Sequence, residues 1–84
     1  MLNEKLIIYG VVWCGDCRRA QKYLRQNQIA FDFINIDHDR AAEQFVLKTN
    51  KGFRSVPTIV FPDGSILVEP SNQQLALKLQ ILEA

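Results

Sequence analysis

The 84-residue sequence predicts one α/β domain, residues 1–84, with the element order β-α-β-α-β-β-α. The chain is long enough for one domain but too short for two, since independent domains rarely contain fewer than about 50 residues. Strand-like stretches alternate with helix-like stretches along it. The first three of these stretches follow one another within about 30 residues, which is typical of a βαβ unit with parallel strands and a right-handed crossover.

The first half of the chain supplies the βαβ unit. Residues 5–9 (KLIIY) predict a buried strand that ends at Gly10. Residues 15–28 predict a helix, because apolar residues recur three and seven positions after Cys17 while basic residues occupy the other faces. Residues 31–36 (FDFINI) are aromatic, β-branched and partly alternating, which favours a second strand. The loop between the first strand and the helix then lies at the C-terminal edge of that strand.

The middle of the chain contains a shorter helix and a hairpin. A helix over residues 40–49 begins after Asp39, a residue type that caps helix N-termini. Residues 57–61 and 65–68 predict two strands on either side of Pro62-Asp63-Gly64, a turn sequence with glycine at the position that needs a positive φ.

The last segment fits two patterns. Its leucines alternate as in a strand, but Leu75, Leu79 and Leu82 also share one face of a helix. We predict a helix, because Ser71 is a good N-cap and the residues after it are strong helix formers with almost no β-branching.

Composition excludes several classes of function. Ten Lys and Arg oppose nine Asp and Glu, and the basic residues are spread along the chain, so nothing requires nucleic acid or an anionic membrane. The apolar run at residues 6–13 is interrupted by Gly10 and is much shorter than the 18 or more residues that span a bilayer. No signal-peptide pattern precedes the cysteines. We expect an unprocessed cytoplasmic protein, and a monomer.

The two cysteines, Cys14 and Cys17, carry the expected chemistry. A disulfide across so short a loop would stabilise little, and in a reducing compartment such a pair is more often catalytic or metal-binding. Structural zinc needs four ligands, and beyond the two cysteines the chain offers only His38, so we expect no metal site. A thiolate at a helix N-terminus is stabilised by free N–H groups. We therefore expect Cys14 to attack substrates, and Cys17, one turn inside the helix, to resolve the mixed disulfide.

The motif VVWCGDC, followed by a helix, SVPT, a hairpin and a final helix, resembles the glutaredoxins of the thioredoxin superfamily over essentially the whole chain. The stretches WCGDC, IDHDRAAEQFV, NKGFRSVPTIVFPDGS and EPS are most similar to the mycoredoxin-like branch. This resemblance implies a thioredoxin fold, with a four-stranded mixed β-sheet flanked by three helices. It also implies that Pro57 is cis and faces the disulfide, while the backbone of Val56 pairs with the bound thiol or peptide.

Two departures from the family pattern concern the substrate. Glutathione-binding members resemble one another in a Gly-Gly pair and acidic residues that open the last helix, where this chain has VEPSN at residues 68–72. The position between the cysteines that usually holds an aromatic residue is Asp16. The substrate therefore remains open among glutathione, another low-molecular-weight thiol and a protein disulfide.

Five further residues are candidates for substrate binding. Trp13 would shield the disulfide and offer a surface to the substrate, although it could simply pack at the strand end. Asp16 lies in the first turn of the helix, where its charge favours the helix but opposes a nearby thiolate. Arg54 would attract an anionic thiol or remain solvated. Ser71 and Asn72 open a helix whose N–H groups could hold a substrate carboxylate or need only a plain cap.

The expected reaction is reduction of a protein disulfide or a mixed disulfide. It needs no cofactor beyond thiols, because an external thiol or a reductase supplies the electrons. Two alternatives remain open. One is a thioredoxin-reductase-fed redoxin that donates electrons to ribonucleotide reductase. The other is a non-enzymatic iron-sulfur carrier, in which two chains and two external thiols supply four thiolates.

Overall fold

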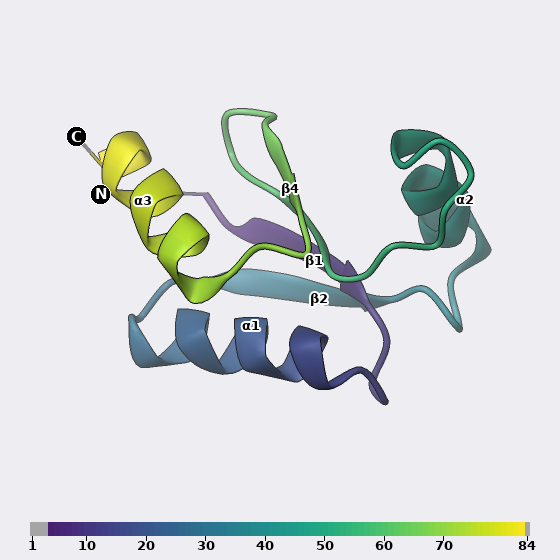
Figure 1. Ribbon diagram of the computed structural model, residues 1–84, viewed down its shortest axis with the longest axis horizontal. Coiled ribbons are helices and arrows are strands. Elements are labelled where there is room, and N and C mark those ends of the chain that lie inside the picture. Colours follow the sequence, from purple (N-terminus) through teal and green to yellow (C-terminus); the bar gives the residue numbers. More distant parts are fainter. Residues whose placement is uncertain (1–3, 84) are drawn as a thin grey trace.

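The computed structural model describes residues 4–83, and the element order predicted from the sequence is confirmed over this range (Figure 1). The seven elements are β1 (Leu6–Gly10), α1 (Gly15–Gln26), β2 (Phe31–Asn35), α2 (Arg40–Thr49), β3 (Thr58–Val60), β4 (Ile66–Val68) and α3 (Asn72–Glu83). Each of the four strands differs by one or two residues from its predicted range. The predicted helix over residues 15–28 ends two residues early, because Gln28 has a φ of 58° and leaves the right-handed helical region.

The four strands form one mixed sheet in the order β2-β1-β3-β4. β1 pairs with β2 in parallel, as the βαβ unit requires, whereas β3 runs antiparallel to both β1 and β4. This arrangement is the predicted thioredoxin fold. It places β1, which leads into the cysteine motif, in the interior of the sheet.

Two apolar clusters cover opposite faces of the sheet. Alternate residues of β1 and β3, including Leu6, Ile8 and Ile59, pack with buried side chains of α1 and α3. On the other face, Tyr9 packs against a smaller cluster that includes Ala42 and Val46 of α2. The two helices α1 and α3 therefore share one face, and α2 covers the other.

Local capping explains where the helices begin. The Asp39 side chain accepts a hydrogen bond from the backbone N–H of Ala42 at 2.9 Å, which confirms the predicted cap of α2. At α3, Ser71 Oγ accepts from Gln74 N at 3.1 Å, and Gln74 Oε1 accepts from Ser71 N at 2.8 Å. This reciprocal pair is a capping box, and it favours the helix over the strand that the leucine alternation also allowed.

The hairpin turn is confirmed as well. Gly64 has a φ of 87°, which a residue without a Cβ adopts at no steric cost. Asp63 accepts hydrogen bonds from the backbone N–H and hydroxyl of Ser65 and a third from Lys78 of α3. These bonds hold the pKa of Asp63 at about 2. Among the described helices, none has both the length and the apolar character needed to cross a bilayer.

The end of β1 packs unusually closely on α1. A Cβ built on Gly10 would lie 2.8 Å from Cys17 Sγ and 3.0 Å from Phe33 Cε1, whereas real Cβ atoms essentially never approach a heavy atom within 3.0 Å. Because glycine has no side chain, the thiol of Cys17 fits directly against the strand backbone. The position of α1 over the sheet therefore depends on the absence of a side chain at Gly10.

We predict that Gly10→Ala lowers the free energy of unfolding by about 1–3 kcal/mol, the usual cost of adding a methyl group to a filled core. Urea denaturation of the reduced protein measures this change. Gly15→Ala is the matched control, since the nearest atom to a Cβ there is Arg18 Nη2 at 3.9 Å. Alanine is also the better helix former, so the control should be neutral or stabilising by up to about 1 kcal/mol. Equal destabilisation by both changes would show that the loss of stability in Gly10→Ala does not come from the contact with Cys17.

Candidate active site

Cys14 is the N-cap residue of α1. Its backbone is extended, with φ −92° and ψ 117°, and its Sγ accepts a hydrogen bond from the backbone N–H of Cys17 at 3.2 Å. The side chain is half-buried, and its thiol is free. The Cys14 sulfur therefore lies at the helix start, with one backbone N–H directed at it.

Cys17 lies one turn further along α1 and is completely buried. Burial raises the pKa of Cys17 to about 12, and the hydrogen bond with Cys14 and the charges of Cys14 and Asp16 add to this shift. A backbone hydrogen bond at Val11 opposes it. Cys17 is consequently a protonated thiol at neutral pH, so two cysteines three positions apart have very different environments.

The loop before β3 lies beside the cysteine motif. Cys14 and Val56 both pack against the cluster of apolar residues under α2. The Val56–Pro57 peptide bond is cis, as the family resemblance implied, and Pro57 is buried. That Pro57 faces the disulfide and that Val56 pairs with substrate remain predictions.

Partly buried hydrogen bonds fix this loop. The Thr58 hydroxyl donates to the carbonyl of Ser55 at 2.8 Å and accepts from Asn50 Nδ2, at the C-terminus of α2, at 3.2 Å. The backbone N–H of Glu69, just after β4, donates to the carbonyl of Pro57 at 2.8 Å. Two separate elements therefore hold the segment around the cis bond in place.

Trp13 belongs to a charged cluster that we call the Trp13 cluster, formed by Trp13, Asp37, Glu43 and Arg54. The indole Nε1 donates to Asp37 Oδ2 at 2.8 Å, although the side chain is 67% exposed. Arg54 donates from Nη2 to Asp37 Oδ1 and from Nε to Glu43 Oε2 at 2.7 Å. The bonds from Trp13 and Arg54 lower the pKa of Asp37.

In the Trp13 cluster, Arg54 has a different environment from the one that the sequence suggested. The sequence suggested a cation available to an anionic thiol or free in solvent. Two carboxylates instead hold the guanidinium of Arg54, so an anionic substrate would have to compete with both of them. Arg54 thereby connects the loop before β3 to α2 and, through Asp37, to Trp13.

Asp16 makes an ion pair on the other side of the motif. Its Oδ1 accepts from Arg19 Nε at 3.1 Å and from Arg19 Nη2 at 2.9 Å. Arg19 also donates to the carbonyl of Pro70 at 2.6 Å and to the side-chain oxygen of Asn72. The side chains of Asn72 and of the capping residue Ser71 thus both make structural bonds at the start of α3. Arg19 joins this start to the first turn of α1.

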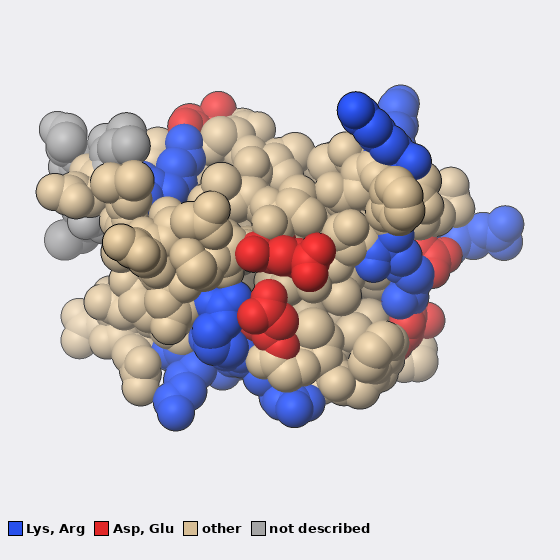
Figure 2. Space-filling model, in the orientation of Figure 1, with Lys and Arg blue, Asp and Glu red and all other residues tan. Residues whose placement is uncertain are grey.

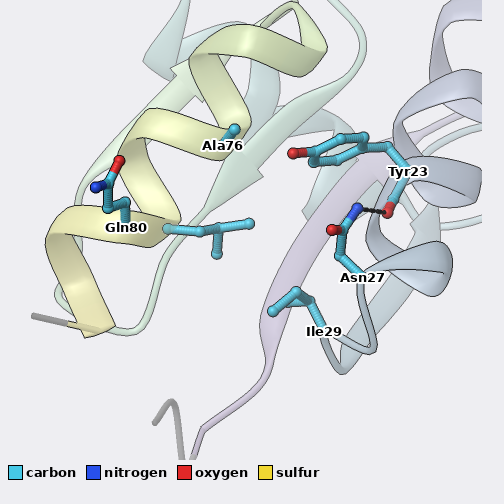
Figure 3. A pocket seen from close by; sticks show the side chains of 6 residues that line it. Tyr23, Asn27, Ile29, Ala76 and Gln80 are labelled. Carbon is cyan, nitrogen blue, oxygen red and sulfur yellow. Dashed lines mark hydrogen bonds between the residues drawn. The ribbon is translucent and has the colours of Figure 1, made fainter.

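Away from the cysteines the described residues offer few other sites. His38 is exposed, as expected for a loop residue, and across residues 4–83 no group of three or more His, Cys, Asp or Glu side chains could hold a metal ion. Figure 3 shows a cavity of about 310 Å³ between the C-terminal half of α1 and α3. It contains no charged side chain and is lined by Tyr23, Asn27, Ile29, Ala76, Leu79 and Gln80.

Gly10, Asp37 and Glu43 are among the residues that shape the site but were not identified from the sequence. The sequence does contain a signal for Gly10, because a glycine ends the strand immediately before the motif. Asp37 and Glu43 had none, since single acidic residues in a loop and on an exposed helix face usually remain solvated. Their role depends on Arg54, which is at least 11 positions away in the chain and near only after folding.

Comparison with known proteins agrees with the geometry. Residues 6–66 match the family model described as glutaredoxin. A Mycobacterium tuberculosis protein named as a glutaredoxin is 46% identical over 79 residues, covering 94% of both chains. Mycoredoxin 1 of Corynebacterium glutamicum is 33% identical over 79 residues, covering 94% of this chain and 98% of its own. The crystal structure of a thioredoxin-like protein has a TM-score of 0.75 at 25% identity, covering 87% of this chain and 97% of that one.

The Trp13 cluster leads to a prediction about the single tryptophan of the protein. Asp37→Ala removes the acceptor of the indole N–H, so the fluorescence anisotropy of Trp13 should fall as the ring gains freedom. Asp32→Ala is the matched control, because it removes an exposed carboxylate that pairs with Lys5 instead. An unchanged anisotropy in Asp37→Ala, or an equal fall in both variants, would contradict a positioning role for Asp37.

Proposed function

The chain belongs to the glutaredoxin family, and we propose that it reduces protein disulfides or mixed disulfides of a low-molecular-weight thiol with the Cys14/Cys17 pair. Glutaredoxin-like relatives support a role in thiol redox chemistry in general. The observation that supports the specific mechanism is the contrast between the two thiols. One sulfur lies at the helix start with a backbone N–H directed at it, and the other is buried and protonated.

In the first step the thiolate of Cys14 attacks one sulfur of the substrate disulfide. The substrate S–S bond breaks, and the second substrate sulfur leaves with the electron pair as a thiolate. A mixed disulfide then joins Cys14 to the substrate. The half-buried position of Cys14 supports this role, because the residue is partly exposed to solvent while its sulfur accepts the Cys17 N–H.

In the second step Cys17 gives up its proton to solvent, and its thiolate attacks Cys14 Sγ. The bond between Cys14 and the substrate breaks, the second substrate sulfur leaves as a thiolate that solvent protonates, and the Cys14–Cys17 disulfide forms. The substrate gains two electrons and the protein loses two. While Cys14 is a thiolate, its charge and hydrogen bond help to raise the pKa of Cys17. The mixed disulfide removes that charge, so Cys17 ionises more readily when it is needed. An external thiol or a reductase then reduces the oxidised pair.

The surrounding residues have distinct proposed roles. The exposed ring of Trp13 and the backbone of Val56, next to Pro57, contact the bound substrate. Arg54 acts through Asp37 as a positioning residue for Trp13. Ser71 and Asn72 hold the start of α3 beside the motif, and Arg19 connects it to Asp16. This arrangement would leave a substrate in contact with the loop before α1 and the loop before β3.

We predict that Cys17→Ser distinguishes the two substrate classes. With excess external thiol, the variant should retain much of its activity on small mixed disulfides, because that thiol can complete the second step. On protein disulfides activity should collapse, and a covalent complex through Cys14 should accumulate on non-reducing gels. Cys14→Ser is the control and should lose both activities.

The opposite pattern would contradict this mechanism. If Cys14→Ser retained activity while Cys17→Ser lost it on both substrates, the assignment of the two thiols would be reversed.

A further inference from the structure

A groove with a basic lining lies between α1 and the edge strand β2. Its volume is about 340 Å³, and its lining residues are Val12, Arg18, Gln21, Arg25 and Phe33. In α1, Gln21 and Arg25 follow Arg18 by three and seven positions, so the three residues share one face of the helix. We call this feature the Arg18/Arg25 groove.

The Arg18/Arg25 groove begins at the loop that carries Cys14. Arg18 Nη1 donates to the carbonyl of Val12, two residues before Cys14, at 3.0 Å. Arg18 Nη2 lies 3.9 Å from the position of a Cβ built on Gly15, the residue after Cys14. The guanidinium of Arg18 is therefore next to the turn that presents the reactive thiol, and the groove leads away from it along α1.

The positive charge in this groove is not neutralised within residues 4–83. Neither Arg18 nor Arg25 forms an ion pair there, whereas the nearby Arg19 pairs with Asp16. Asp32 of β2 alternates to the other face of the sheet and pairs with Lys5. In Figure 2 basic side chains follow the lower edge of the molecule, where α1 lies in Figure 1.

Arg25 is held in an orientation that suits binding. Its guanidinium lies over the ring of Phe31 at 5.4 Å, and Nη2 donates to Gln21 Oε1 at 3.2 Å. Stacking and a neutral acceptor restrict the side chain without cancelling its charge. An incoming carboxylate would thus meet a partly ordered cation.

We propose that the Arg18/Arg25 groove binds an extended acidic segment of the protein whose disulfide is reduced, an inference that rests on the proposed function. Seven residues of helix separate the two arginines by about 10 Å. An extended segment in the polyproline II conformation advances about 3.1 Å per residue with three residues per turn, so carboxylates three positions apart share one face and lie about 9 Å apart. Val12 and Phe33 offer apolar contact to the residues between them.

The test uses synthetic peptides that each contain one cysteine in a mixed disulfide with 2-mercaptoethanol. One set carries two glutamates three positions apart, on either the N-terminal or the C-terminal side of the cysteine. The other set carries glutamines at the same positions. Single-turnover reaction with the reduced protein should be roughly fivefold faster for one of the glutamate peptides at low salt. This preference should shrink as salt is added.

Variants of the groove residues then test whether the Arg18/Arg25 groove causes the preference for glutamate peptides. Arg18→Gln combined with Arg25→Gln should remove it, and the corresponding double lysine variant should keep most of it. Lys22→Gln combined with Lys48→Gln is the matched control, because it removes two charges from α1 and α2 outside the groove lining. This control should keep the full preference.

Three results would overturn the proposal. They are equal rates for glutamate and glutamine peptides, a preference that survives in the double arginine variant, and an equal loss in the lysine control, which would indicate net charge alone. Each rate is expressed relative to the reduction of uncharged bis(2-hydroxyethyl) disulfide by the same variant, which corrects for a change in Cys14 reactivity and tests the proposed function separately. A wild-type protein unable to reduce it would refute the proposed function, and the groove's role with it.

Discussion

The contact between the Cys17 thiol and the backbone of Gly10 is the constraint on which the rest of the site depends. It holds the first turn of α1 against β1, because only glycine leaves room for sulfur at this point of the strand. The same contact removes Cys17 from water and keeps it protonated. Cys14, at the start of the same helix, remains half-buried with a backbone N–H directed at its sulfur. One packing interaction thus makes two identical side chains chemically different.

Polar contacts between distant segments assemble the remainder of the site. The Trp13 cluster joins the loops before α1 and β3 to α2, and Thr58 joins the residues after the cis bond to Asn50. Arg19 performs a similar function at the start of α3. Each of these bonds is modest in energy, but together they restrict three loops around Cys14. A small domain has little buried surface with which to hold loops, so such bonds have a large effect on the geometry of the site.

Much of this structure could be predicted from the sequence because its signals are local. The caps at Asp39 and Ser71 and the positive φ at Gly64 follow from residue chemistry within a few positions. The burial of Cys17 follows from helical periodicity. The partners of Arg54 could not be predicted, because they lie on other elements and no local pattern marks them. The Arg18/Arg25 groove could not be predicted either, because it forms only when β2 lies beside α1.

The most direct test of the account is differential alkylation of the reduced protein between pH 6 and pH 9, with the modified cysteine identified by mass spectrometry. Only the thiolate reacts, and burial keeps the pKa of Cys17 at about 12, whereas a cysteine exposed by unfolding ionises near 9.0. We expect iodoacetamide to modify Cys14 first and to leave Cys17 unmodified until denaturant unfolds the chain. Equal modification of both cysteines in the folded protein, or faster modification of Cys17, would contradict the central claim that packing against Gly10 separates their roles.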